Sequence, residues 1–121
     1  MKTRKQSLKS LLKLADKLYQ VKLIREKPKS VVSGKPTEVI HHFIYKSQSA
    51  YLRYDYNNGV PLTNKEHNQH HLSGDPMIVT AIVGYYGQAW ADDLQKRRRI
   101  TQKTNKGYLK DIITKLSDNA L

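Results

Sequence analysis

Apolar side chains recur with a helical period near the start of the chain, and the pattern predicts an amphipathic helix over residues 3–26. Its apolar stripe consists of Leu8, Leu11, Leu12, Ala15, Leu18, Tyr19 and Leu23. Much of the remaining surface carries lysine, at Lys5, Lys9, Lys13, Lys17 and Lys22. We expect the stripe to pack on the domain and Pro28 to end the segment. The lysines then form either an ordinary solvated face or a contact with a phosphate backbone.

Two short runs rich in β-branched residues follow, at 30–33 and 37–43. A turn that contains glycine and proline separates them, and such an arrangement predicts a β-hairpin. Residues 44–62 have a mixed pattern, so we expect a loop there with a turn at 57–59.

The second half of the chain has helical periodicity and clear helix boundaries. Thr63 and Glu66 fit a capping box, in which a hydroxyl and a carboxylate satisfy exposed backbone donors. Gly74 should stop that helix, and Asp75 followed by Pro76 should cap and open the next one. These signals predict four helices, over residues 63–72, 77–84, 86–98 and 106–117.

These elements predict an α+β fold that is mostly helical, with a small β-hairpin and one helix at its core. The chain has 121 residues, which suits one compact domain. We divide it into a basic helical arm at 1–28, a core at 30–74 and C-terminal helices at 75–121. No apolar run approaches the roughly 18–20 residues that cross a bilayer, and lysines interrupt the N-terminal apolar stretch. We therefore expect a soluble, intracellular protein without membrane contact.

Charge and cysteine content narrow the function. The chain has 22 lysines and arginines against 10 aspartates and glutamates, a formal net charge of +12. Such an excess attracts polyanions, of which nucleic acid is the commonest inside cells, although a merely soluble basic protein is the simpler alternative. Cysteine is absent, which excludes disulfides, thiol nucleophiles and cysteine-based zinc sites. Any transition metal must therefore be held by histidine or carboxylate.

All five histidines lie between residues 41 and 71, and metal binding is the most economical explanation for that clustering. His67 and His71 are four apart on a predicted helix, so their imidazoles project from one face. His70 is three residues from His67 and could compete for the role. On a strand, His41 and His42 point to opposite faces, so one can bind metal while the other stays free as a base. Three imidazoles from His41, His67 and His71 would leave an open position, which is typical of catalytic sites.

This arrangement resembles the HNH, or ββα-metal, nuclease motif, in which a β-hairpin with paired histidines precedes an asparagine and a helix with the remaining ligands. The pattern here is His41-His42, then Asn58, then His67 and His71. As in the all-histidine version of the DNase colicins, the asparagine precedes the first helix ligand by nine positions, and the second ligand follows four later. The resemblance implies a DNA endonuclease with one divalent ion, Zn²⁺, Mg²⁺, Mn²⁺ or Ni²⁺, on His41, His67 and His71. It also implies that His42 is the general base and that Asn58 positions its loop.

Three segments carry a narrower resemblance: Ile40-His41-His42-Phe43-Ile44-Tyr45, Leu52-Arg53-Tyr54-Asp55-Tyr56-Asn57-Asn58 and Leu72-Ser73-Gly74. They look like the phage NinG/Rap recombination nucleases, which bear a lysine-rich N-terminal helix before the site and further helices after it. The likeness extends over residues 8–117. It implies recombination and cutting of branched DNA such as Holliday junctions, in the cytoplasm of a bacterial host cell. The chain departs from that family in having no cysteine around the site.

Six basic residues are candidates for contacts to DNA: Arg53, Arg97, Arg98, Arg99, Lys9 and Lys13. Arg53 lies in the loop before the asparagine, where it could grip a phosphate or pair with Asp55. The arginine run at 97–99 could equally form a solvated face. A last group, Tyr85, Tyr86 and Trp90, follows helical spacing and is expected in the core rather than as a platform for stacked bases.

Two other functions fit the same residues. The histidines could close a structural zinc site with four ligands in a non-catalytic DNA-binding module, with His70 or His42 as the fourth. Alternatively, they are incidental in a basic RNA-binding or structural protein. Within the nuclease interpretation, cutting two strands with one site per chain would favour a homodimer.

Overall fold

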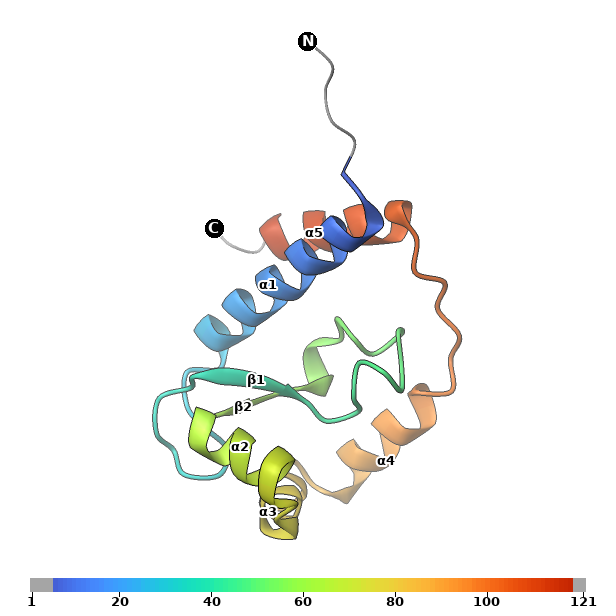
Figure 1. Ribbon diagram of the computed structural model, residues 1–121. Helices are drawn as coiled ribbons and strands as arrows, with labels where there is room; N and C mark the ends of the chain where they lie inside the picture. The colour runs from blue at the N-terminus through green and yellow to red at the C-terminus, as the bar shows by residue number, and fades with distance from the viewer. Residues whose placement is uncertain (1–5, 119–121) are drawn as a thin grey trace.

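The computed structural model describes residues 6–118, and within them five α-helices surround a two-stranded sheet (Figure 1). The fold is α+β and mostly helical, as predicted. Helix α1 spans Leu8–Glu26 and is capped by the side chain of Ser7, which accepts a hydrogen bond from the backbone of Ser10. Residues 3–5 of the predicted helix, Lys5 among them, lie outside the described residues.

A β-hairpin occupies the centre of the fold. Strand β1, Val39–His42, pairs antiparallel with strand β2, Gly59–Leu62. On the outer edge of β1, the side-chain amide of Gln20 donates to the carbonyl of Ile40 and accepts from its N–H, both at 2.8 Å. This amide takes the place of a neighbouring strand, because it satisfies backbone groups that an edge strand leaves open.

The predicted hairpin had the wrong pair of strands. Residues 30–33 form a turn with one isolated bridge between Lys29 and Pro36, and β2 comes from the 44–62 segment that was expected to be a loop. Pro61 hides this strand, since proline argues against a strand in a sequence pattern. Its nitrogen faces the outer edge of β2, where no hydrogen bond of the ladder is lost.

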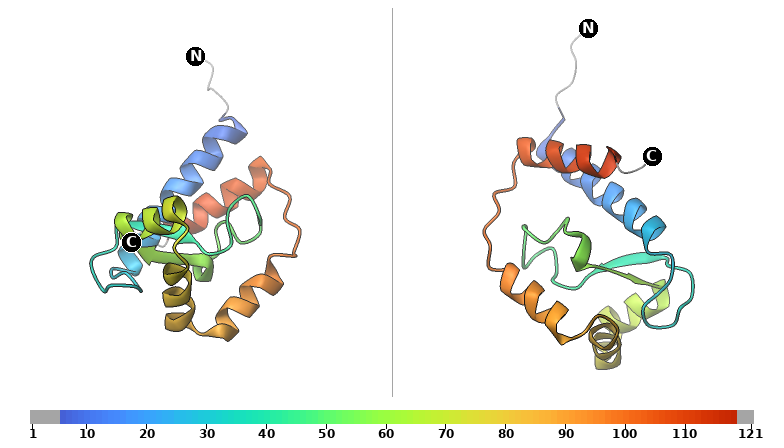
Figure 2. Two further views of the ribbon diagram at one scale, coloured as in Figure 1. Left: turned by 60° about the horizontal axis from the view of Figure 1, so that its bottom comes forward. Right: turned by 180° about the vertical axis from the view of Figure 1, so that it is seen from behind.

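Helix α5, Lys106–Asp118, packs against α1 on one side of the hairpin (Figures 1 and 2). The buried residues of this layer are Leu11, Ala15, Tyr19, Leu23, Ile40, Leu109 and Leu116. The segment that the sequence assigned to a basic arm is therefore anchored by its apolar stripe, while Lys9, Lys13 and Lys17 remain exposed.

The helices of the second half follow the predicted boundaries to within two residues, with α2 at Asn64–Ser73, α3 at Pro76–Tyr86 and α4 at Gln88–Arg97. The capping box of Thr63 and Glu66 is confirmed, and Gly74 ends α2 in the left-handed conformation, with φ at 62°. The buried residues around these helices are Ile44, Leu52, Val60, Leu62, Ile78, Ile82 and Leu94. No helix of the described residues is long and apolar enough to cross a bilayer.

Candidate metal centre

Four histidine rings gather where α2 packs against β1. The ring centroid of His41, a buried residue of β1, lies 5.3 Å from that of His67, 5.0 Å from that of His70 and 5.2 Å from that of His71. Within α2, the rings of His67 and His71 are 4.4 Å apart. The capping box fixes the start of α2 directly after β2, and this turn brings the histidine-rich helix back to the first strand.

Three of these imidazoles have nitrogens close enough to share a metal ion. The ligand atoms of His41, His70 and His71 all lie within 4.8 Å of one another. The structure therefore brings two of the predicted ligands, His41 and His71, together with His70 in the third place. The role of His67 as a ligand stays a prediction, because its ring lies beside those of His41 and His71 but is not part of this set.

His70 provides the observation that argues for a metal here. Its Nε2 lies 3.0 Å from the hydroxyl oxygen of Tyr45, whereas its Nδ1 is buried and has no hydrogen-bond partner among the described residues. A buried polar atom without a partner costs free energy, and a metal bound to Nδ1 would remove that cost. The proton would then sit on Nε2 and point to Tyr45, the kind of outer contact that orients metal-binding imidazoles. The residues present fit a divalent ion.

Burial favours the neutral form of three of these imidazoles, those of His41, His67 and His70. It lowers the pKa of His41 to about 3, with a further lowering from the neighbouring histidines, His70 foremost. The pKa values of His67 and His70 are also lowered, mainly by burial and then by the proximity of His71. Because metal ligands must be unprotonated, neutral imidazoles are the form that binds a divalent ion.

His42 turns away from the cluster toward α1 but borders the same cavity, which has a volume of about 240 Å³. Its ring stacks on that of Tyr19, with centroids 5.1 Å apart, and its Nε2 lies 2.8 Å from the carbonyl oxygen of Arg53. Burial lowers the pKa of His42 to about 4, and the hydrogen bond to Arg53 opposes that shift. His42 is thus a neutral, oriented imidazole on the same cavity as His41, His67 and His71.

Asn58 closes the loop between the two strands. It is fully buried, its Oδ1 accepts from the N–H of Ile44 at 2.8 Å, and its Nδ2 donates to the carbonyls of Ile44 at 2.9 Å and Leu52 at 3.2 Å. Leu52 directly precedes Arg53, whose carbonyl contacts His42. Asn58 therefore binds the segment whose next carbonyl contacts His42, and its role in positioning a base stays a prediction.

Arg53 is held by a carboxylate, but not by the expected one. Its Nε and Nη2 donate to the two carboxylate oxygens of Asp16 at 3.0 and 2.6 Å, and the hydroxyl of Tyr54 donates to the same group at 2.9 Å. The alternative pair with Asp55 does not form, because Asp55 binds Arg97 at 2.6 Å. The charge of Arg53 is compensated within the fold, and its side chain ties the loop to α1.

The other predicted DNA contacts lie on helix surfaces. Arg97 pairs with Asp93 at 2.9 Å as well as with Asp55, so it is also committed to carboxylates. The remaining candidates are exposed: Arg98, Arg99, Lys9 and Lys13.

The aromatic residues near the end of α3 lie differently from the prediction. Tyr86 and Trp90 are half-buried and stack on each other, with ring centroids 4.4 Å apart. Tyr85 is 65% exposed, so the expectation of a core position is wrong for this residue. Tyr85 and its neighbour Gly84 both lie exposed in the last turn of α3.

Comparison with known proteins identified no relative: no family model, no curated protein and no solved structure matches this chain.

Proposed function

We propose that this protein is a metal-dependent endonuclease of the HNH type that hydrolyses phosphodiester bonds in DNA. The observation that carries the proposal is that His42 borders the same cavity as His41 and His71, two members of the imidazole cluster. The order of elements also supports it: a strand with paired histidines, a loop closed by a buried asparagine, a second strand and a helix with further histidines.

His42 acts as the general base. Its Nε2 donates to the carbonyl of Arg53, so the lone pair of the neutral ring lies on Nδ1, which accepts a proton from the attacking water. A pKa near 4 keeps this lone pair free at neutral pH. A phosphate that enters the cavity adds negative charge and raises this pKa toward the range in which an imidazole is an effective base.

The imidazoles of His41, His70 and His71, with His67 as the alternative third ligand, hold the divalent ion. When bound, the ion supplies a Lewis acid for the phosphate oxygens and for the departing oxygen. Three imidazoles suit Zn²⁺ and Ni²⁺, whereas Mg²⁺ or Mn²⁺ would be held in part through the substrate. Tyr45 orients the ring of His70 from outside.

The net charge of +12 attracts the DNA, and the exposed Lys9, Lys13, Arg98 and Arg99 are the candidates for contacts to its backbone. A function in phage recombination, with branched DNA as the substrate in the host cytoplasm, is the more specific proposal. It rests on the three sequence segments that resemble the NinG/Rap nucleases. A homodimer belongs to the same proposal, since two sites would cut two strands.

The test compares the wild type with His42→Ala on supercoiled plasmid and on a synthetic four-way junction, with Mg²⁺, Mn²⁺ or Zn²⁺ and then with EDTA. We expect the wild type to cut, EDTA to stop cutting, and His42→Ala to bind DNA in a mobility-shift assay without cutting it. Gln48→Ala, at an exposed position of the loop that follows β1, is the control and should cut normally. Preference for the junction would support the recombination function.

A second function has one observation in its favour. The ring of His67 lies beside those of His41 and His71, so a fourth imidazole is near the set of His41, His70 and His71, and four ligands are the number that a closed structural zinc site in a DNA-binding module needs. Such a protein would unfold on chelation and bind DNA, but no divalent ion would make it cut. That combination of results would replace the nuclease proposal.

A further inference from the structure

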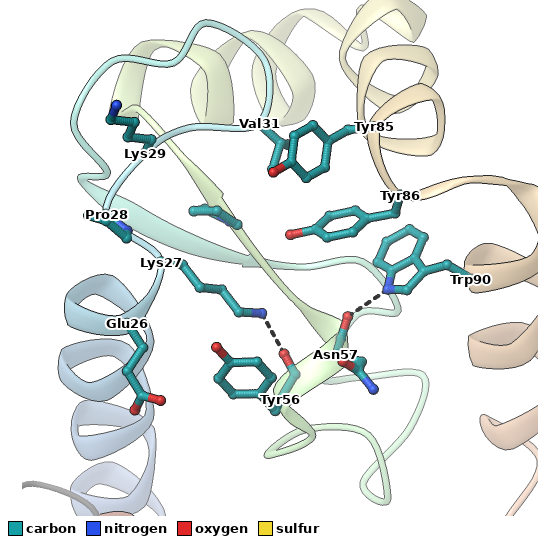
Figure 3. Close-up of a pocket in the computed structure, with 11 residues that line it drawn as sticks. Glu26, Lys27, Pro28, Lys29, Val31, Tyr56, Asn57, Tyr85, Tyr86 and Trp90 are labelled. Carbon is teal, nitrogen blue, oxygen red and sulfur yellow. Dashed lines mark hydrogen bonds between the residues drawn. The ribbon is translucent and has the colours of Figure 1, made fainter.

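A second cavity lies beside β2, whereas the histidine cavity lies beside β1. It has a volume of about 400 Å³, within the range of about 300–1,000 Å³ that small-molecule sites occupy. Its walls come from the end of α1, the turn before β2 and the junction of α3 with α4 (Figure 3). None of these walls belongs to the proposed metal centre.

Aromatic rings dominate the walls of this cavity. Tyr85 and Tyr86 contribute rings at 84° to each other, and Trp90 continues the wall by stacking on Tyr86. Tyr56 lies across the cavity from them and is 45% exposed, while Tyr85 is 65% exposed (Figure 3). Aromatic faces left open to water around a hollow are typical of a site for a flat ring, since stacking would remove them from solvent.

Hydrogen-bonding groups accompany the rings. The ammonium of Lys27 donates to the carbonyls of Tyr56 and Gly59, both at 2.7 Å, which leaves its third N–H for a ligand. Asn57 is exposed at the same wall, and its carbonyl accepts from the indole N–H of Trp90 while its side-chain amide is turned from that bond (Figure 3). Donor and acceptor groups therefore accompany the aromatic walls of the cavity.

The charges at the cavity favour an anionic ligand. Lys27 and Lys29 stand against a single carboxylate, that of Glu26, which lies 4.0 Å from the ammonium of Lys22. The ammonium of Lys27 sits 4.0 Å over the ring of Tyr56, so a trimethylammonium-type cation, the usual guest of aromatic cages, would meet a positive charge.

We propose that this cavity binds an unpaired nucleobase of a DNA strand, stacked on the ring of Tyr85 with its edge toward Tyr86, and with the adjoining phosphate near Lys29. The choice of DNA over another nucleotide polymer rests on the proposed nuclease function. Unpaired bases are what branched or open DNA offers, and stacking on aromatic rings accepts any base. The cavity is also linked to His42, the proposed general base. The carbonyl of Gly59 accepts a hydrogen bond from Lys27, and Gly59 pairs with His42 across the hairpin.

Trp90 makes the test direct, since it is the only tryptophan of the chain and lines the cavity. Intrinsic fluorescence is followed while wild-type protein in EDTA is titrated with a short oligothymidylate, and then with an abasic strand of equal length and charge. We expect quenching and saturable binding with the thymidylate, and about tenfold weaker binding with little quenching for the abasic strand. Equal affinity and equal quenching with both strands would overturn the proposal.

Two substitutions complete the test. Tyr85→Ala should weaken thymidylate binding about tenfold without changing the thermal melt, because the side chain is mostly exposed, and Tyr85→Phe should restore it. Unchanged thymidylate binding by Tyr85→Ala would also overturn the proposal. So would an unrelated peptide that displaces the thymidylate from the cavity. His42→Ala should bind the strand like wild type. If the protein binds the thymidylate but never cuts plasmid, only the nuclease proposal is contradicted. If it cuts plasmid but binds both strands equally, only the proposed nucleobase site is contradicted.

Discussion

The Nε2 atom of His42 lies 2.8 Å from the carbonyl oxygen of Arg53. The guanidinium of the same arginine makes a two-point ion pair with Asp16 on α1. Arg53 therefore connects α1 to His42, the proposed general base. Its side chain binds Asp16 on α1, and its backbone carbonyl contacts the ring of His42. Asp16 is therefore connected to His42 through Arg53, although it does not line the cavity.

Asp16→Asn should reduce cutting more than it reduces stability. The amide cannot form the charged two-point contact with Arg53, so the loop carbonyl that orients His42 loosens. We expect kcat on plasmid to fall about ten- to a hundredfold, the range for residues that orient a site from outside. Asp93→Asn is the control, because Asp93 also pairs with an arginine but on the exposed side of α4. Equal activity of the two variants would contradict this role for Asp16.

The same carboxylate should make the free energy of unfolding depend on pH. Burial acts to raise the pKa of Asp16, but hydrogen bonds from Arg53 and Tyr54 outweigh it and hold the pKa below its ordinary value of 3.8. Because the pKa is lower in the folded protein, the stabilisation is present above the unfolded-state pKa and is lost as the pH falls through the folded one. Urea unfolding at several pH values should show the advantage of wild type over Asp16→Asn shrinking below about pH 5. A constant difference across that range would contradict the linkage.

Asn58→Ala should destabilise the fold and abolish cutting together. Removal of the amide leaves the buried N–H of Ile44 and the carbonyls of Ile44 and Leu52 without this partner, at a cost of about 3 kcal/mol in the free energy of unfolding. Asn57→Ala, one residue earlier but exposed, should cost less than about 0.5 kcal/mol. Urea denaturation of both variants provides the measurement, and similar values for the two would show that the loop does not depend on Asn58.

Single alanine substitutions on α2 distinguish the two candidate third ligands. If His41, His70 and His71 bind the ion, His70→Ala should weaken Zn²⁺ binding by more than about a hundredfold, beyond the effect of an orienting residue, while His67→Ala should weaken it about tenfold. Isothermal titration calorimetry with Zn²⁺ on the metal-free protein measures both. The reverse ranking would restore the triad that the sequence predicts.

Local signals in the sequence were sufficient for the helices. The capping box at Thr63, the left-handed Gly74 and the proline that opens α3 each depend on neighbouring residues alone, and all three appear where expected. The pairing of β1 with Gly59–Leu62 is of another kind, because sixteen residues separate the two strands and only the packed core decides the partner. A β-branched run next to a turn was the stronger local signal, and it was the wrong one.

The candidate site divides in the same way. Sequence spacing placed His41 and His71 together, and the structure brings their ligand atoms within 4.8 Å of each other. It could not rank His70 against His67, since the choice depends on how α2 rotates against β1 and on the contact with Tyr45. It also could not find the Asp16–Arg53 pair, whose members lie 37 residues apart.

Gly59→Ala should disturb both the fold and the site, because three side chains pack directly against this glycine. A methyl group there would lie 2.4 Å from Leu23 Cδ2, 2.6 Å from the hydroxyl of Tyr19 and 2.8 Å from Ile40 Cγ2. Relief of these contacts must move β2 or the ring of Tyr19, and that ring stacks on His42. We expect a loss of about 1–3 kcal/mol in the free energy of unfolding, together with reduced cutting.

Gly84→Ala is the matched control, since no described atom lies within 4 Å of a methyl group there outside its own helix. It should stabilise α3 by about 0.5–1 kcal/mol and leave cutting unchanged. Equal unfolding free energies for the two variants would mean that the core around Gly59 can yield without moving His42.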